Sequence, residues 1–150
     1  MPIEHFLLRL GAALIAGLLI GIEREIQNKN AGLKTNALVA IGASVFVLVS
    51  LKFKGDDYVD TTRVIGQIVT GIGFIGAGVI LHKGTIVRGL TTAATVWCSA
   101  AAGCLAAIGE FKELLVLVVL IVFINVVFGP VDKYIRGKFN DGKDGERKED

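Results

Sequence analysis

The sequence predicts an all-α integral membrane protein in which five transmembrane helices form one bundle. Of its 150 residues, 53% are hydrophobic and only 20% are charged, whereas charged residues make up nearer ~25% of a soluble domain. Five apolar stretches each have a length within the roughly 17 to 25 residues that a helix needs to cross a bilayer. They are residues 5–22, 36–53, 64–82, 90–108 and 112–129. The loops between them are too short to hold a soluble domain.

Lysine and arginine residues near the membrane predict the orientation, because they are commoner on the cytoplasmic side. Nine lie on one side, namely Arg24, Lys29, Lys34, Lys83, Arg88, Lys133, Arg136, Lys138 and Lys143, against Lys52, Lys54, Arg63 and Lys112 on the other. We therefore expect the N-terminus outside and the C-terminus in the cytoplasm. The net charge of +2 offers no basic face of the kind that binds nucleic acid.

The first stretch carries a face of small residues and one arginine. The small residues are Ala13, Ala16, Gly17 and Gly21, which predict close helix packing. Arg9 falls on the same face, and a charge inside a membrane often marks a function. Because Arg9 lies only a few residues from the start of the stretch, we favour a side chain that extends to water at the membrane surface.

Charged and polar residues end the first stretch and begin the second. They are Glu23, Arg24, Glu25, Lys34 and Asn36. Such residues at a helix end are normally solvated, and exposed ion pairs contribute less than about 1 kcal/mol each. We expect solvated helix ends here; in a transporter, the same five residues would form the cytoplasmic mouth.

An acidic loop, with Asp56, Asp57 and Asp60, follows the second stretch. One or two carboxylates can hold Mg²⁺, which keeps most of its waters. The spacing matches no calcium loop, and nearby basic residues balance the charge. A solvated loop is the favoured interpretation, and whether any metal binds stays open.

Five glycines interrupt the third stretch, residues 64–82. On a helix they form two faces, one with Gly71 and Gly78 and one with Gly66, Gly73 and Gly76. Glycine faces let helix backbones approach closely in a membrane, so we expect this helix at the centre of the bundle with neighbours on both sides. The amide of Gln67, near Gly71, would then point into a helix contact and need a partner.

Residues 71–76 also match the dinucleotide-binding pattern G-x-G-x-x-G. That pattern has meaning in a turn between a strand and a helix, with an acidic residue about 20 positions further on. These glycines lie inside a continuous apolar run, and the next acidic residue is Glu110. We therefore reject a nucleotide site.

A stripe of small hydroxylated and thiol side chains follows one side of the fourth stretch. Its members are Thr91, Thr92, Thr95, Cys98 and Ser99. Such side chains often bond the preceding turn or a neighbouring helix, which is the favoured interpretation. They can equally line a narrow polar path together with Gln67. Cys98 and Cys104 lie about 240° apart on the helix, so they cannot bridge each other within it.

Two segments share the pattern G-L-x-T-x-A-x-V at an offset of 57, residues 32–39 and 89–96. Both begin a stretch from the same side of the membrane. This favours a parallel repeat of stretches 1–2 and 3–4, and transporters often place a site between such repeats.

The fifth stretch is aliphatic on all sides apart from Asn125, which predicts a peripheral helix against lipid. We expect Gly129-Pro130 to stop it. The transmembrane domain would then span residues 1–130. Residues 131–150 would form a short basic segment at the membrane interface and a disordered cytoplasmic tail.

Four ordered segments together resemble the MgtC/SapB family of bacterial inner-membrane proteins. They are Glu23-Arg24-Glu25, AGLKTNALVAIGA (31–43), TGIGFIGAGVIL (70–81) and VRGLTTAATVW (87–97). The resemblance covers most of residues 5–128. It implies a plasma-membrane protein with about five spans, linked to magnesium homeostasis, growth in low magnesium and, in pathogens, survival inside host cells. It also implies, for some members, the proton-translocating ATP synthase as a partner.

Two departures from the family pattern matter. Many relatives carry a soluble domain after the membrane part, whereas we expect the membrane domain alone in this chain. The family often has arginine and histidine where this chain has Lys34 and Asn36. A role that needs a guanidinium or an imidazole there is therefore not expected.

We thus expect a non-enzymatic membrane protein without a cofactor, which contacts the lipid bilayer and acts through helix contacts with itself, as a homodimer, or with another membrane complex. The alternative is a transporter or channel for Mg²⁺, protons or another small solute, with a path between the third and fourth helices. His5 and His82 lie near the ends of their stretches, without the nucleophile and acid that an active site would place beside them.

Overall fold

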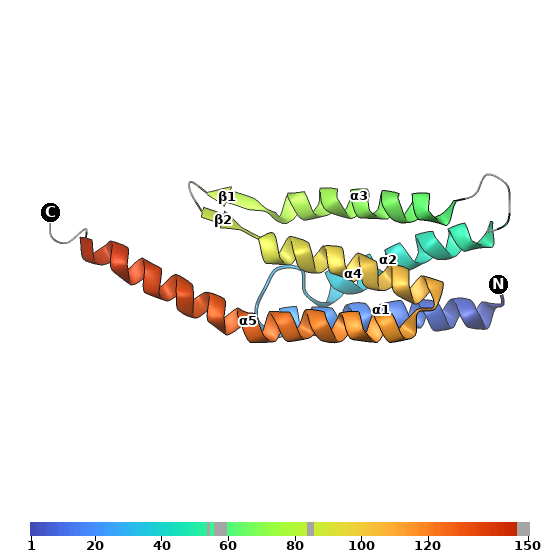
Figure 1. Ribbon diagram of the computed structural model, residues 1–150, viewed down its shortest axis with the longest axis horizontal. Coiled ribbons are helices and arrows are strands. Elements are labelled where there is room, and N and C mark those ends of the chain that lie inside the picture. Colours follow the sequence, from blue (N-terminus) through green and yellow to red (C-terminus); the bar gives the residue numbers. More distant parts are fainter. Residues whose placement is uncertain (54, 56–59, 84–85, 147–150) are drawn as a thin grey trace.

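Five long helices and one small β-hairpin make up the computed structural model, which describes residues 1–53, 55, 60–83 and 86–146. The elements are α1 (Ile3–Ile26), α2 (Leu33–Lys52), α3 (Thr61–Val79), β1 (Leu81–Lys83), β2 (Ile86–Arg88), α4 (Leu90–Ile108) and α5 (Phe111–Glu146). Successive helices run in opposite directions (Figure 1). The first four, and residues Phe111–Gly129 of α5, are long and apolar enough to cross a membrane. The predicted five-helix membrane fold is confirmed.

Helix α4, rather than α3, lies at the centre of the bundle, because it contacts each of the other four helices (Figure 1). Its buried side chains are small, and include Ala100, Ala102, Ala106 and Ala107. By contrast, Gly76 is the one buried residue of α3. The expectation of a central α3 is wrong. Alanine permits close helix packing as glycine does, so the number of glycines alone does not show which helix lies at the centre.

Glycines bring the backbones of α1, α2 and α4 close together. A Cβ atom built on Gly17 would lie 2.7 Å from the Ala37 Cα, and one on Gly21 would lie 2.7 Å from the Leu33 Cα. A Cβ on Gly103 would collide with the Ala40 carbonyl oxygen. The core of the bundle is therefore narrow, and large apolar side chains point mainly outward, as they do towards lipid.

Helix α5 does not stop at Gly129-Pro130 but continues to Glu146, and it bends where it leaves the bundle (Figure 1). A proline inside a helix removes one backbone donor and commonly produces a kink rather than an end. Five residues before Pro130, the Asn125 carbonyl accepts a bond from Gln27 Nε2 at 3.3 Å. Of the last ten residues, for which the composition predicts disorder, 141–146 belong to α5 and 147–150 lie outside the described residues.

The connection between α3 and α4 contains a two-stranded antiparallel hairpin that the apolar pattern did not indicate. Helix α3 ends at Val79, three residues before the predicted limit, and His82 pairs with Val87 in the hairpin. Gly89 follows the second strand with φ 92°, and a Cβ atom built on it would collide with the Val79 carbonyl oxygen. This close approach leaves no room for a larger residue.

Helices α2 and α4 begin at Leu33 and Leu90, which are 57 residues apart, and each follows a glycine. This agrees with the offset of the repeated motif. The two helix pairs nevertheless pack differently: Gly21 contacts α2, whereas a Cβ on Gly78, its counterpart, meets nothing within 4 Å. A parallel repeat remains a prediction.

Asp60 begins α3, and its side chain accepts bonds from the Thr62 amide at 2.8 Å and the Thr62 hydroxyl at 2.6 Å. Asp56 and Asp57 lie outside the described residues. Within the part of the chain that the structure describes, no group of three His, Cys, Asp or Glu side chains could hold a metal ion.

The Thr62 bonds lower the pKa of Asp60. Because the pKa of Asp60 is lowered in the folded state, its carboxylate stabilises the helix start at pH values above the ordinary aspartate pKa. This stabilisation is lost as the pH falls through the lowered pKa. We expect the Thr62 amide to lose hydrogen-exchange protection below about pH 4, where an ordinary aspartate takes up its proton. Asp60→Ala should show the same loss at neutral pH, and Asp60→Ser, which keeps a cap, should not. Equal protection in all three proteins would contradict the capping role.

Candidate functional site: a buried polar cluster

Buried and half-buried polar side chains gather at one end of the bundle, where α1 ends, α2 and α4 begin and α5 departs. We call this end the tail end. The tail-end cluster comprises Glu23, Arg24, Gln27, Asn36, Thr92, Ser99 and Asn125. Polar groups in a membrane domain are costly unless bonded and usually mark a functional site.

Glu23 and Arg24 are buried because α1 continues four residues past its predicted limit. Their exposed fractions are 6% and 3%, so the expectation of solvated helix ends is wrong for both. The loop after α1 turns back at once, with Asn28 and Ala31 in the left-handed region. The start of α2 therefore closes over the end of α1, which the local charge pattern does not reveal.

Arg24 joins α1 to α4. Its Nη2 atom donates to the Thr92 hydroxyl at 2.7 Å, whereas its Nε atom has no partner among the described residues. A buried guanidinium with one hydrogen bond is incompletely satisfied. This contact makes the first turn of α4 dependent on the end of α1.

Asn36 joins α2 to α4 and is fully buried. Its Nδ2 atom donates to the carbonyls of Ala31, at 2.5 Å, and Gly32, at 2.9 Å. Its Oδ1 atom accepts from the Ser99 hydroxyl at 2.8 Å. Asn36 thus bonds the left-handed turn on one side and the central helix on the other.

Asn125 brings α5 into the cluster. Its backbone carbonyl accepts from Gln27, and its Nδ2 atom is buried with no partner among the described residues. Both carboxylate oxygens of Glu23 are likewise buried without a partner there. Asn125 and Gln27 are the functional candidates that sequence reasoning missed. The sequence signal for Asn125 was a polar residue in an otherwise aliphatic span. The signal for Gln27 was its position one helical turn after Glu23.

The remaining candidates lie in varied surroundings. Thr95 is buried and donates to the Thr91 carbonyl at 2.8 Å, while Thr91 itself is exposed. Cys98 is partly buried, and Gln67 and Lys34 are exposed. The exposed Glu25 accepts from the Leu33 amide at 3.3 Å. Because Thr92 and Ser99 bond α1 and α2, these two hydroxyls do not line a space between α3 and α4.

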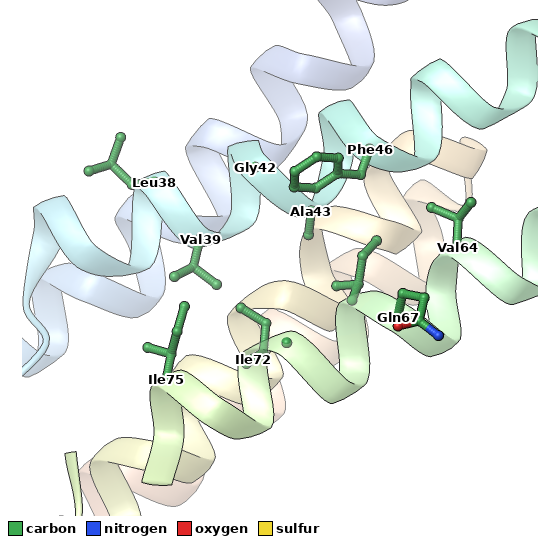
Figure 2. Close-up of a pocket in the computed structure, with 11 residues that line it drawn as sticks. Leu38, Val39, Gly42, Ala43, Phe46, Val64, Gln67, Ile72 and Ile75 are labelled. Carbon is green, nitrogen blue, oxygen red and sulfur yellow. The ribbon is translucent and has the colours of Figure 1, made fainter. Parts of the chain in front are cut away.

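A groove of about 530 Å³ lies between α2 and α3 (Figure 2). Its lining is apolar except for Gln67, and includes Leu38, Val39, Phe46, Ile72 and Ile75. A lining of this kind suits an apolar chain or helix rather than a hydrated ion. The groove is therefore separate in both place and chemistry from the tail-end cluster.

A second cavity, of about 500 Å³, lies at the N-terminal end of the bundle and includes Arg9 and Glu110 in its lining. Arg9 Nη1 donates to the Ala107 carbonyl at 2.6 Å. The last carbonyls of a helix lack internal partners and attract a positive charge. Arg9 therefore binds the end of α4, whereas the sequence favoured a side chain that reaches only for water.

The fold and the cluster define a multi-pass membrane protein with a small-residue core and a polar centre at one end. Residues 10–134 match the model of the MgtC family, and the chain belongs to this family. It is 49% identical over 122 residues to Protein MgtC of Salmonella typhimurium, covering 81% of this chain and 52% of that protein. It is 47% identical over 130 residues to Protein MgtC of Brucella abortus, covering 87% and 54%. The chain thus spans about half the length of these relatives, and no solved structure matches it.

Proposed function

We propose that this chain is a non-enzymatic bacterial plasma-membrane protein linked to magnesium homeostasis, and that it acts through helix contacts with itself or with another membrane complex. Membership of the MgtC family supports the link to magnesium. The basic residues favour an N-terminus outside and a cytoplasmic tail end. The resemblance to the family suggests the ATP synthase as one such complex.

The observation that carries this proposal is the bare outer face of α3. Gly66, Thr70, Gly73 and Ala77 are exposed and follow one another at helical spacing. A Cβ atom on Gly66 or Gly73 would meet nothing within 4 Å. Small residues at this spacing favour close contact between membrane helices, where packing rather than hydrophobicity drives association.

Gln67 supports a helix, rather than lipid alone, as the neighbour of α3. Its amide is exposed within the span and beside the apolar groove (Figure 2). Acyl chains cannot bond an amide, and an unbonded amide in an apolar medium costs several kcal/mol. In a two-fold symmetric dimer residue i of one copy meets residue j of the other, and j meets i, so that a Gln67 amide at the edge of the bare face would find its hydrogen-bond partner on the second copy.

The test compares Gly73→Leu with Gly11→Leu, in which the added side chain also has open space but lies on α1. The dissociation constant of the dimer would be measured by Förster resonance energy transfer between fluorescently labelled chains, in liposomes that contain different amounts of protein. We expect Gly73→Leu to weaken association about tenfold, which corresponds to about 1.4 kcal/mol, and to impair growth in low magnesium. Gly11→Leu should change neither. A wild-type monomer at every density, with growth unaffected by Gly73→Leu, would overturn the proposal.

The alternative function is a transporter or channel for a small ion. The buried hydroxyls of α4 are side chains that could line an ion path. Two of them, on Thr92 and Ser99, are however bonded to neighbouring helices. The groove between α2 and α3 is apolar. Flux of Mg²⁺ or protons into liposomes that hold the protein, blocked by Thr95→Leu, would support the alternative.

A further inference from the structure

The side chain of Glu23 is an unusual group for a membrane helix. It is 94% buried, since its exposed fraction is 6%, and it lies on α1 near α5. Neither carboxylate oxygen has a hydrogen-bond partner among the described residues. An ionised carboxylate in such a place lacks the two or three donors that normally stabilise its charge.

The positive charges of Arg24 and Lys29 favour an ionised Glu23, but within the described residues neither group forms an ion pair with it. Arg24 is adjacent in sequence, but its guanidinium bonds Thr92 on α4. Within the described part of the chain, the one ion pair shorter than 4 Å joins Arg63 and Asp60 at the opposite end. The Lys29 ammonium group, which is exposed after the end of α1, interacts with Glu23 only through its charge and forms no hydrogen bond with it.

The neighbour on α5 is a primary amide, which can pair with a neutral carboxyl group. The Asn125 amide approaches Glu23, and an N–H that it donated would favour the carboxylate, but its Nδ2 atom makes no hydrogen bond among the described residues. A protonated carboxyl has one donor and one acceptor, as does a primary amide that faces it. A small adjustment of either side chain would then give two reciprocal hydrogen bonds, whereas a carboxylate could accept only one from this amide.

We propose that Glu23 is a proton-binding site, where the carboxyl is held as a neutral acid between α1 and α5 and pairs with the Asn125 amide. The proton is the ligand. The site depends on neither the α3 contact nor any link to magnesium, so its failure would leave the proposed function untouched.

The first test is labelling by dicyclohexylcarbodiimide, an apolar reagent that adds to protonated carboxyls within membranes. The wild-type chain in liposomes would be treated between pH 5 and pH 8, and the labelled residue identified by mass spectrometry. An ordinary glutamate is protonated only about once in 500 at pH 7. We therefore expect Glu23 to react on the order of 100-fold faster than such a residue. Glu23→Gln should abolish the label, and Glu25→Gln should retain it.

The second test is the pH dependence of thermal unfolding. If Glu23 keeps a proton in the folded protein and loses it on unfolding, stability falls as the pH rises, and the unfolding constant grows by up to about tenfold per pH unit. Glu23→Gln supplies a neutral amide of the same shape and should remove this slope without loss of stability. Asn125→Leu should narrow the pH range over which stability falls with rising pH, because the neutral acid loses its hydrogen-bond partner.

The proposal is overturned if Glu23 stays unlabelled at every pH and Glu23→Gln destabilises the chain at pH 7 more than Glu25→Gln does. That result would mean an ionised carboxylate whose charge Arg24 balances. Labelling of Glu23 that appears only in an Arg24→Gln variant would overturn it in the same way.

Discussion

Replacing Asn36 by aspartate is expected to open the tail end of the bundle, although the two side chains have nearly the same shape. The change removes the donor that bonds the carbonyls of Ala31 and Gly32. It also places a carboxylate oxygen against these two carbonyl oxygens in a fully buried position. An uncompensated buried charge costs about 3–5 kcal/mol. We expect a large fall in the melting temperature measured in detergent, so that most of the variant is unfolded at temperatures where the wild type is folded.

The matched control is Asn28→Asp. Asn28 also has a left-handed backbone, with φ 53°, but its side chain is exposed. This variant should melt like the wild type. If Asn36→Asp melted within a degree or two of Asn28→Asp, the bonds of Asn36 to Ala31, Gly32 and Ser99 would not contribute to stability and the cluster would need another account.

Replacing Gly17 by alanine is expected to force α1 and α2 apart. A single methyl group at this position would lie 2.7 Å from both the Ala37 Cα and the Asn36 carbonyl oxygen. These are backbone atoms, which cannot move aside as a flexible side chain can. Overpacking of this kind typically costs about 1–3 kcal/mol. We expect a lower melting temperature and weaker hydrogen-exchange protection at the start of α2.

Gly11→Ala on the same helix provides the control, because a Cβ there meets nothing within 4 Å. Alanine has a higher helix propensity than glycine by roughly 1 kcal/mol, so Gly11→Ala should be neutral or stabilising. An equal response of the two variants would mean that propensity, rather than contact between α1 and α2, decides the result. The same comparison can be made with Gly103, which faces the Ala40 carbonyl.

The polar cluster shows how membrane burial can be missed in a sequence. Glu23 and Arg24 have the composition of a solvated helix end, and nothing in their neighbours distinguishes them from Glu25, which is exposed. The difference arises because α1 continues to Ile26 and because α4 and α5 lie against this turn. Asn125 lies 102 positions after Glu23, and only the packing of α5 on α1 brings the two residues together.

The sequence by itself determined that this chain forms five membrane-crossing helices, because the length of an apolar run is a local property that a bilayer reads directly. It also determined the close contact that Gly17 and Gly21 permit. The tertiary structure decided that α4 takes the centre, that α3 leaves most of its glycines unpartnered, and that Glu23, Arg24 and Asn36 are buried. Lipid solvates an apolar helix face about as well as another helix does, so apolar pattern alone cannot rank the helices. Fine differences in close packing and polar pairing make that choice.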